Sequence, residues 1–222
     1  MGSVLTDDFA CCLAKEFVLR LLDKFSAKIS ELEWASVFAR CMGADWSSSE
    51  CEWSVTRQDG IAWCAKIIAN CQPHKVKHVV LEFNGFDVDN VHTEEANQLG
   101  EMILGAWNAR IAEVRKQFVT TRTVVLIKGD DLSTVSVFEE EALKFLPEEY
   151  EWDWNQEDNL EGYVKGTGVK RFTWQPHVSR FSITTNVPDN RLKICIRRPS
   201  LVDRDEVLTQ LKFDPSWIEI VA

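Results

Sequence analysis

Residues 58–118 read QDGIAWCAKIIANCQPHKVKHVVLEFNGFDVDNVHTEEANQLGEMILGAWNARIAEVRKQF, and this stretch decides the fold that we expect. Asp59-Gly60 predicts a hairpin turn, because this dipeptide tolerates the positive backbone angles that tight turns require. Apolar runs predict strands over residues 61–69 and 76–83, and the 3.6-residue period after Thr93 predicts a helix to Phe118. The short loop between the two strands predicts that they are adjacent and antiparallel.

Two carboxylates in this stretch suggest a function for it. Asp59 lies at the turn and Glu82 lies on the second strand, with the long helix packed behind both. Carboxylates in this arrangement can hold a divalent cation near a phosphodiester, so we expect Asp59 and Glu82 to lie a few ångströms apart as metal ligands. In the alternative interpretation, Asp59-Gly60 is only a turn and Glu82 only a solvated strand residue.

The flanking sequence completes a mixed α/β fold. Helical spacing predicts a first helix over residues 7–28, and Ser30 with Glu33 predicts a capping box for a second helix that ends at Gly43. Further strands are expected at residues 53–56, 123–127, 133–138, 150–154, 170–174, 180–185 and 191–196, and a last helix at residues 203–211, docked on the body. We expect residues 1–145 to form a core with a central mixed sheet flanked by helices. Residues 146–222 are expected to form a β-rich part packed on this core in one compact unit.

The bulk composition narrows the classes of protein. The chain has 222 residues, of which 45% are hydrophobic and 27% charged, and this is ordinary globular composition. No apolar run reaches the length of a membrane span, and Asp7-Asp8 precedes any segment that could act as a secretory signal, so a cytoplasmic protein is expected. The seven cysteines lack a Cys-x-x-Cys spacing, so neither a disulfide framework nor a zinc site is indicated.

Charge is distributed unevenly along the chain, whose net charge is -10. Residues 139–161 carry ten acidic side chains and one basic one, whereas residues 164–199 carry eight basic side chains against Asp189. A basic band on an acidic body can serve a specific polyanion. The mixture of basic, aromatic and amide side chains in this band predicts nucleic-acid contacts from Lys170, Arg171, Trp174, Gln175, His177 and Arg180. Alternatively, the band is a solvated sheet face over an aromatic core.

The order of helix, antiparallel strands, Asp59, a Glu82-Phe83-Asn84 strand end, helix and strand resembles the PD-(D/E)XK nuclease superfamily, which includes many type II restriction endonucleases. The resemblance covers roughly residues 8–128 and implies a restriction-endonuclease-like core, Mg²⁺ bound by Asp59 and Glu82, and double-stranded DNA as substrate. It also assigns Glu16, on the first helix, the place of an accessory acid.

The chain departs from the family pattern at Asn84, which occupies the position of the family's lysine. An amide cannot accept a proton as that lysine could, so another amine would have to orient the attacking water. The expected strand register places Lys66 beside Glu82, and Lys66 is therefore our candidate for the displaced lysine.

Three classes of function follow from these observations. The first is a metal-dependent DNA endonuclease of restriction type, in which Asn84 would also belong to the active site. The second is a catalytically inert protein of the same fold that binds nucleic acid or a protein partner. The third is an acidic inhibitor that mimics DNA with the surface of residues 139–161. Restriction-type enzymes are often twofold dimers, so a homodimer is a further possibility for this chain.

Overall fold

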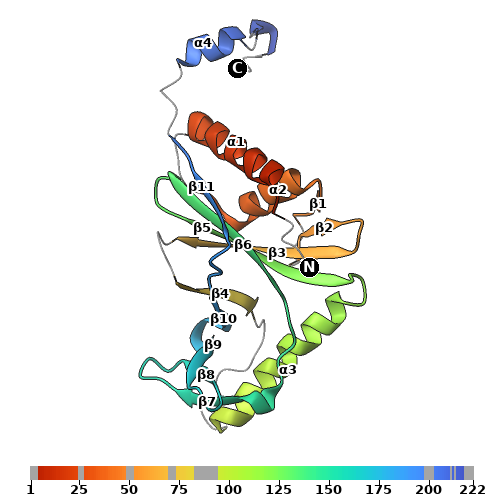
Figure 1. Cartoon of the computed structure of the whole chain (residues 1–222), viewed down its shortest axis with the longest axis vertical. Helices are drawn as coiled ribbons and strands as arrows, with labels where there is room; N and C mark the ends of the chain where they lie inside the picture. Colours follow the sequence, from red (N-terminus) through yellow and green to blue (C-terminus); the bar gives the residue numbers. More distant parts are fainter. Residues whose placement is uncertain are drawn as a thin grey trace, which may run out of the picture.

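The computed structural model describes residues 5–24, 28–48, 53–69, 74–82, 95–197, 203–210, 212 and 214–217. It is a mixed α/β structure with two sheets and four helices in its described part (Figure 1). The helices are α1 (Asp7–Lys24), α2 (Glu31–Met42), α3 (Ala96–Val114) and α4 (Arg204–Gln210). Three short 3₁₀ helices are η2 (Pro147–Glu149), η3 (Pro176–Val178) and η4 (Pro215–Trp217).

The first sheet is mixed and has six strands. Their spatial order is β1 (Asp45–Trp46), β2 (Val55–Arg57), β3 (Ile61–Ala69), β5 (Thr120–Lys128), β6 (Thr134–Glu141) and β11 (Leu192–Cys195). Among the described strand pairs, only β3 and β5 are parallel, and α3 belongs to the connection between them. Parallel neighbours need such a long crossover, so α3 is placed against the body by this connection.

The second sheet is antiparallel and has five strands. Their order is β4 (Lys75–Glu82), β10 (Arg180–Asn186), β9 (Val169–Gln175), β8 (Leu160–Val164) and β7 (Tyr150–Trp154). The first sheet therefore contains β11 from the C-terminal part of the chain, and the second sheet contains β4 from the N-terminal part. The boundary expected near residue 145 does not separate the two sheets.

The core fills the spaces on both faces of the first sheet. On one face, α1 and α2 bury Phe17, Trp34 and Phe38 against Trp63 of β3. On the other face, α3 and the second sheet bury Trp107, Trp174 and Phe181 together with β3 residues Ala62 and Cys64. Period-2 alternation on the strands and period-3.6 spacing on the helices predict these faces, which is why the element types were predictable.

Local signals in the sequence explain most of the element boundaries. The capping box is present, because Ser30 Oγ accepts a hydrogen bond from the Glu33 amide at 3.2 Å while Glu33 Oε2 accepts one from the Ser30 amide at 2.9 Å. Gly43 ends α2 with φ of 60°. The expected start at Thr93 lies outside the described residues, and α3 is capped by Glu95 without a side-chain hydrogen bond. Strand β8 had not been predicted.

The predicted pairing of residues 61–69 with residues 76–83 is wrong. Strand β3 lies in the first sheet between β2 and β5, whereas β4 is an outer strand of the second sheet and pairs with β10 from Glu82↔Arg180 to Lys75↔Asn186. The packing explains this outcome, because pairing with β10 lets Val76 and Val80 of β4 face the apolar side of the first sheet. Adjacency in sequence did not decide the partner.

Candidate functional site

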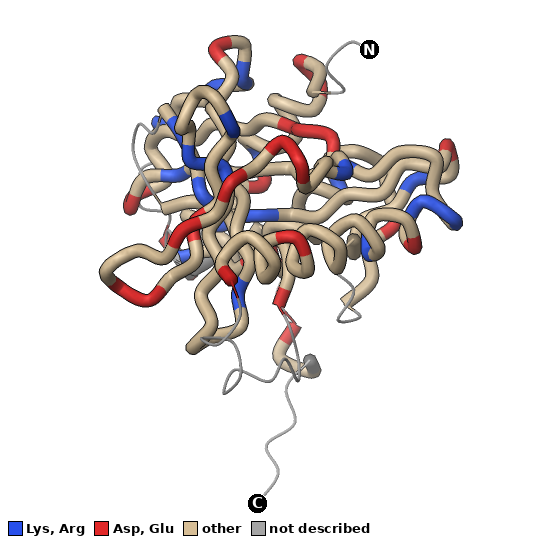
Figure 2. Tube along the Cα trace, turned by 90° about the horizontal axis from the view of Figure 1, so that it is seen from below, with Lys and Arg blue, Asp and Glu red and all other residues tan. Residues whose placement is uncertain are grey.

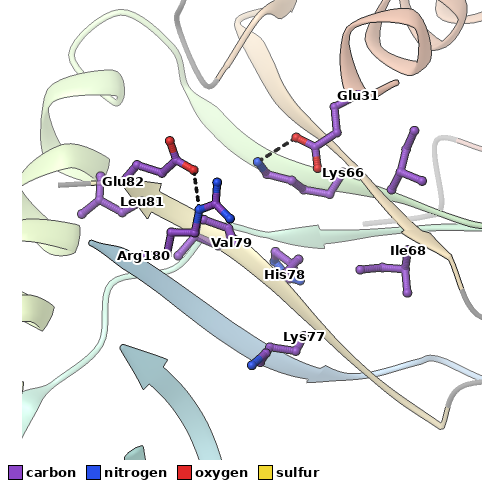
Figure 3. Close-up of a pocket in the computed structure, with 11 residues that line it drawn as sticks. Glu31, Lys66, Ile68, Lys77, His78, Val79, Leu81, Glu82 and Arg180 are labelled. Atoms are coloured by element: carbon purple, nitrogen blue, oxygen red, sulfur yellow. Dashed lines mark hydrogen bonds and ion pairs between the residues drawn. The ribbon is translucent and has the colours of Figure 1, made fainter. Parts of the chain in front are cut away.

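An open cleft of about 800 Å³ lies where the two sheets meet (Figure 3). Its lining residues come from the start of α2, the second half of β3, most of β4 and the start of β10: Glu31, Lys66, Ile67, Ile68, Lys77, His78, Val79, Val80, Leu81, Glu82 and Arg180. Strand β2 pairs only with the first three residues of β3, and β4 has no described partner besides β10. The cleft therefore follows two strand segments, each of which has no described strand partner along one edge.

Two ion pairs cross the walls of the cleft. Lys66 Nζ lies 3.2 Å from Glu31 Oε2, and Arg180 Nε lies 2.9 Å from Glu82 Oε1 (Figure 3). The side chains of Arg180 and Glu82 are 50% and 59% exposed. Exposed pairs of this kind contribute about 0 to 1 kcal/mol, so their partners can be exchanged for other charged groups.

His78 lies at the inner wall of the cleft and has almost no contact with solvent. Its Nε2 lies 3.3 Å from Glu140 Oε1 of β6, while its Nδ1 is buried without a hydrogen-bond partner among the described residues. Burial, reinforced by the positive charges of Lys66 and Arg171, lowers the pKa of His78 to about 3. The imidazole is therefore neutral at pH 7.

A chain of polar contacts continues from His78 between the two sheets. Burial raises the pKa of Glu140, and its Oε1 accepts a hydrogen bond from Thr185 Oγ1 at 3.1 Å. The Thr185 hydroxyl in turn lies 3.4 Å from Arg171 Nη1, which also donates to the Thr184 carbonyl. We call His78, Glu140, Thr185 and Arg171 the polar seam, because they join β4, β9 and β10 of one sheet to β6 of the other.

Of the predicted catalytic residues, the structure brings Lys66 and Glu82 to the same cleft. Asp59 is not among the residues that line it. Asp59 lies just before β3, at the opposite end of that strand from the cleft, and the five steps from Ile61 to Lys66 alone span about 17 Å. Asp59 is instead held by Arg57, whose Nε lies 3.0 Å from Asp59 Oδ1 and whose hydrogen bonds lower the pKa of this carboxyl.

The remaining catalytic candidates do not join this group. Glu16 of α1 pairs with Arg40 of α2 at 3.0 Å, on the far side of the first sheet from α3. Asn84 lies outside the described residues. Within the part of the chain that the structure describes, no three His, Cys, Asp or Glu side chains gather as a metal site would require. Asp59, Glu82 and Glu16 are each paired with an arginine, and of these three only Glu82 lines the cleft.

The predicted nucleic-acid-binding residues are divided among different environments. Trp174 is fully buried under α3 and cannot stack on a base, because its strand position faces the core. Lys170 pairs with Glu161 at 3.0 Å, and Arg171 is part of the polar seam. Gln175 is half-buried and His177 is exposed on η3. Of the six, only Arg180 lines the cleft.

Some acidic side chains of residues 139–161 are paired with other side chains within the fold. Glu139 accepts a hydrogen bond from Trp63 Nε1 at 2.7 Å and pairs with Arg122, and Glu161 accepts hydrogen bonds from Asn155, Tyr163 and Lys170. Basic and acidic residues intermingle over the body instead of forming two opposite halves (Figure 2). These contacts weigh against a continuous acidic surface that imitates DNA.

Sequence reasoning missed His78, Glu140, Lys77 and Glu31. A signal for His78 was available, because it shares the strand phase of Val76 and Val80 and is a polar residue at a position that alternation marks as buried. No comparable signal identified Glu140 or Glu31, whose relation to the cleft depends on how the sheets pack.

Comparisons with protein-family models, curated proteins and solved structures found no match for this chain. Among the described helices, none has the length and apolar character that a membrane crossing needs.

Proposed function

We propose that the cleft binds the phosphate backbone of a nucleic acid, with DNA as the expected ligand. The observation that supports this proposal is that cations from three strands line one open cleft: Lys66 from β3, Lys77 from β4 and Arg180 from β10. Cations contributed by separate strands can contact successive phosphates, and such contacts supply most of the affinity in protein–DNA complexes.

The charge balance of the cleft favours an anion. Its two carboxylates, Glu31 and Glu82, are each held by one of the cations, and Lys77 has no ion pair with a described residue. A phosphate could take the place of Glu82 on the half-exposed Arg180 guanidinium, which binds phosphate through two parallel hydrogen bonds. The apolar part of the wall, formed by Ile67, Ile68, Val79 and Leu81, offers contacts to sugars and bases.

Fluorescence anisotropy with labelled DNA tests the proposal. Lys77→Ala and Arg180→Ala should each weaken binding and reduce the slope of log affinity against log salt by about one unit on duplex DNA. Lys116→Ala is the matched control, because this lysine is exposed at the end of α3 and does not line the cleft. Separate single-stranded and duplex probes show which form binds. Equal affinities and slopes in all four proteins would contradict the proposal.

A metal-dependent endonuclease remains the second candidate, because Lys66 and Glu82 line one cleft. The same DNA can be incubated with Mg²⁺ or Mn²⁺ and compared with EDTA. If cleavage occurs, Glu82→Gln and Lys66→Met should abolish it, whereas Asp59→Asn should leave it intact because Asp59 precedes β3 and does not line the cleft. Binding without cleavage would instead favour the inert alternative.

A further inference from the structure

Helix α4 is exposed on all sides. All the side chains from Asp205 to Gln210 are exposed, including the apolar Val207 and Leu208, which are 38% and 43% accessible. Figure 1 shows α4 beyond α1 and outside the two sheets. The sequence-based expectation that this helix docks on the body of its own chain therefore does not agree with the structure.

A helix of this length needs a surface to pack on. Isolated helices shorter than about 12 residues are marginal in water, and most helical stability in proteins comes from packing of an apolar face. The sequence directly after α4 adds the apolar residues Leu211, Phe213, Trp217 and Ile218. By sequence, the C-terminal segment therefore carries apolar side chains that can add to a contact made by α4.

A groove on the outer surface of α1 and α2 offers such a surface. It encloses about 500 Å³, and Phe17 and Val37 contribute to its lining. Three of its large apolar side chains are exposed: Leu19 is 59% accessible, Leu32 is 57% and Trp46 is 41%. Exposed apolar side chains gathered in one groove mark a site of protein interaction.

The charges of the groove and of α4 are complementary. Arg40 is the most exposed charged side chain of the groove at 64%, whereas its partner Glu16 is only 18% exposed. The groove therefore presents a cation to an approaching partner. Helix α4 begins with Arg204, Asp205 and Glu206, and Asp203 precedes it, so its start carries three acidic side chains against one basic one.

We propose that α4 of one copy docks in the groove between α1 and α2 of a second copy. The second copy is the occupant because no residue of α4 is among those that line the groove of its own chain. When two copies exchange helices reciprocally, the contact forms twice around a twofold axis, which closes the assembly as a dimer. The small contact implies a dimer that dissociates at low protein concentration.

Light scattering coupled to size exclusion, over a series of protein concentrations, tests the dimer. Wild-type protein should shift from monomer to dimer, and both Leu32→Asp in the groove and Leu208→Asp in α4 should remain monomeric. Both substituted residues are largely exposed, so the folded monomer should persist, as circular dichroism would verify. Val119→Asp is the control, because Val119 is 82% exposed outside the groove and should leave the dimer unchanged.

Mixing the two variants provides the decisive measurement. The Leu208→Asp protein has an intact groove and the Leu32→Asp protein has an intact α4, so the mixture can form one of the two contacts. Energy transfer between differently labelled variants should therefore reveal a heterodimer weaker than the wild-type dimer. A wild-type protein that stays monomeric, or variants that lose thermal stability without any change in assembly, would overturn the proposal, the latter result indicating docking within one chain.

Discussion

At the scale of single residues, His78 shows how the fold changes the chemistry of a side chain. The imidazole is buried, so its protonation in the folded state requires a pH near 3, whereas an unfolded chain takes up the proton near pH 6.5. Between these values the unfolded state binds more protons than the folded state. The free energy of unfolding should therefore decrease as the pH falls from 6.5 towards 3.

This dependence on pH gives a prediction for His78→Gln. The substitution replaces the titrating imidazole by a neutral side chain of similar size. Between pH 7 and pH 4.5 the wild-type protein should lose about 2 to 3 kcal/mol more stability than the variant, because each pH unit below 6.5 costs about 1.4 kcal/mol. Urea unfolding at the two pH values measures the difference. His177→Gln changes an exposed residue and should lose as much stability between the two pH values as the wild type does. Equal losses of stability in all three proteins would contradict the burial of His78.

The raised pKa of Glu140 acts in the opposite direction. Its carboxyl keeps a proton to higher pH in the folded state than in the unfolded state, so this group alone makes the fold more stable as the pH falls. Glu140 is present in both proteins of the comparison. The difference between wild type and His78→Gln in how the free energy of unfolding changes with pH therefore reports the histidine and its coupling to Glu140.

At the scale of elements, α3 and β7 approach each other so closely that only glycine fits between them. A Cβ atom at Gly100 would lie 2.3 Å from the indole atoms of Trp152. That indole is buried and stacked on Phe172, with ring centroids 5.6 Å apart, and so cannot move aside. Gly105 lies on the same helix, and a Cβ atom there would meet nothing within 4 Å.

The two glycines therefore predict opposite effects of the same substitution. Gly105→Ala should stabilise the protein by about 0.5 to 1 kcal/mol, because alanine is the better helix former. Gly100→Ala should destabilise it by about 1 to 3 kcal/mol despite the same gain, because overpacking distorts a rigid aromatic contact. Midpoints of urea unfolding measure both changes, and stabilisation by Gly100→Ala would mean that α3 lies further from β7.

At the scale of the whole molecule, the exchange of strands between the two parts of the chain should make them depend on each other. A fragment of residues 1–145 lacks β10, the described partner of β4, and also β11. We expect this fragment to show no sigmoidal unfolding in urea by tryptophan fluorescence. A chain that ends at residue 202 loses α4 and the residues after it, keeps both sheets, and should keep the transition. Cooperative unfolding of the 1–145 fragment would show that the first part folds independently.

The amino-acid sequence determined the types and approximate limits of nearly all the elements, because hydrophobic period, capping residues and turn dipeptides act over a few neighbouring positions. The range of β3, the capping box at Ser30 and the end of α2 at Gly43 follow from such local rules. Tertiary structure decided which strands pair. Strand β4 pairs with β10, about a hundred residues away, because this pairing buries Val76 and Val80 against the first sheet. The candidate site follows the same division. Lys66 and Glu82 were predictable as polar strand residues, whereas the presence of Arg180 and His78 in the same cleft depended on sheet packing, which no local pattern encodes.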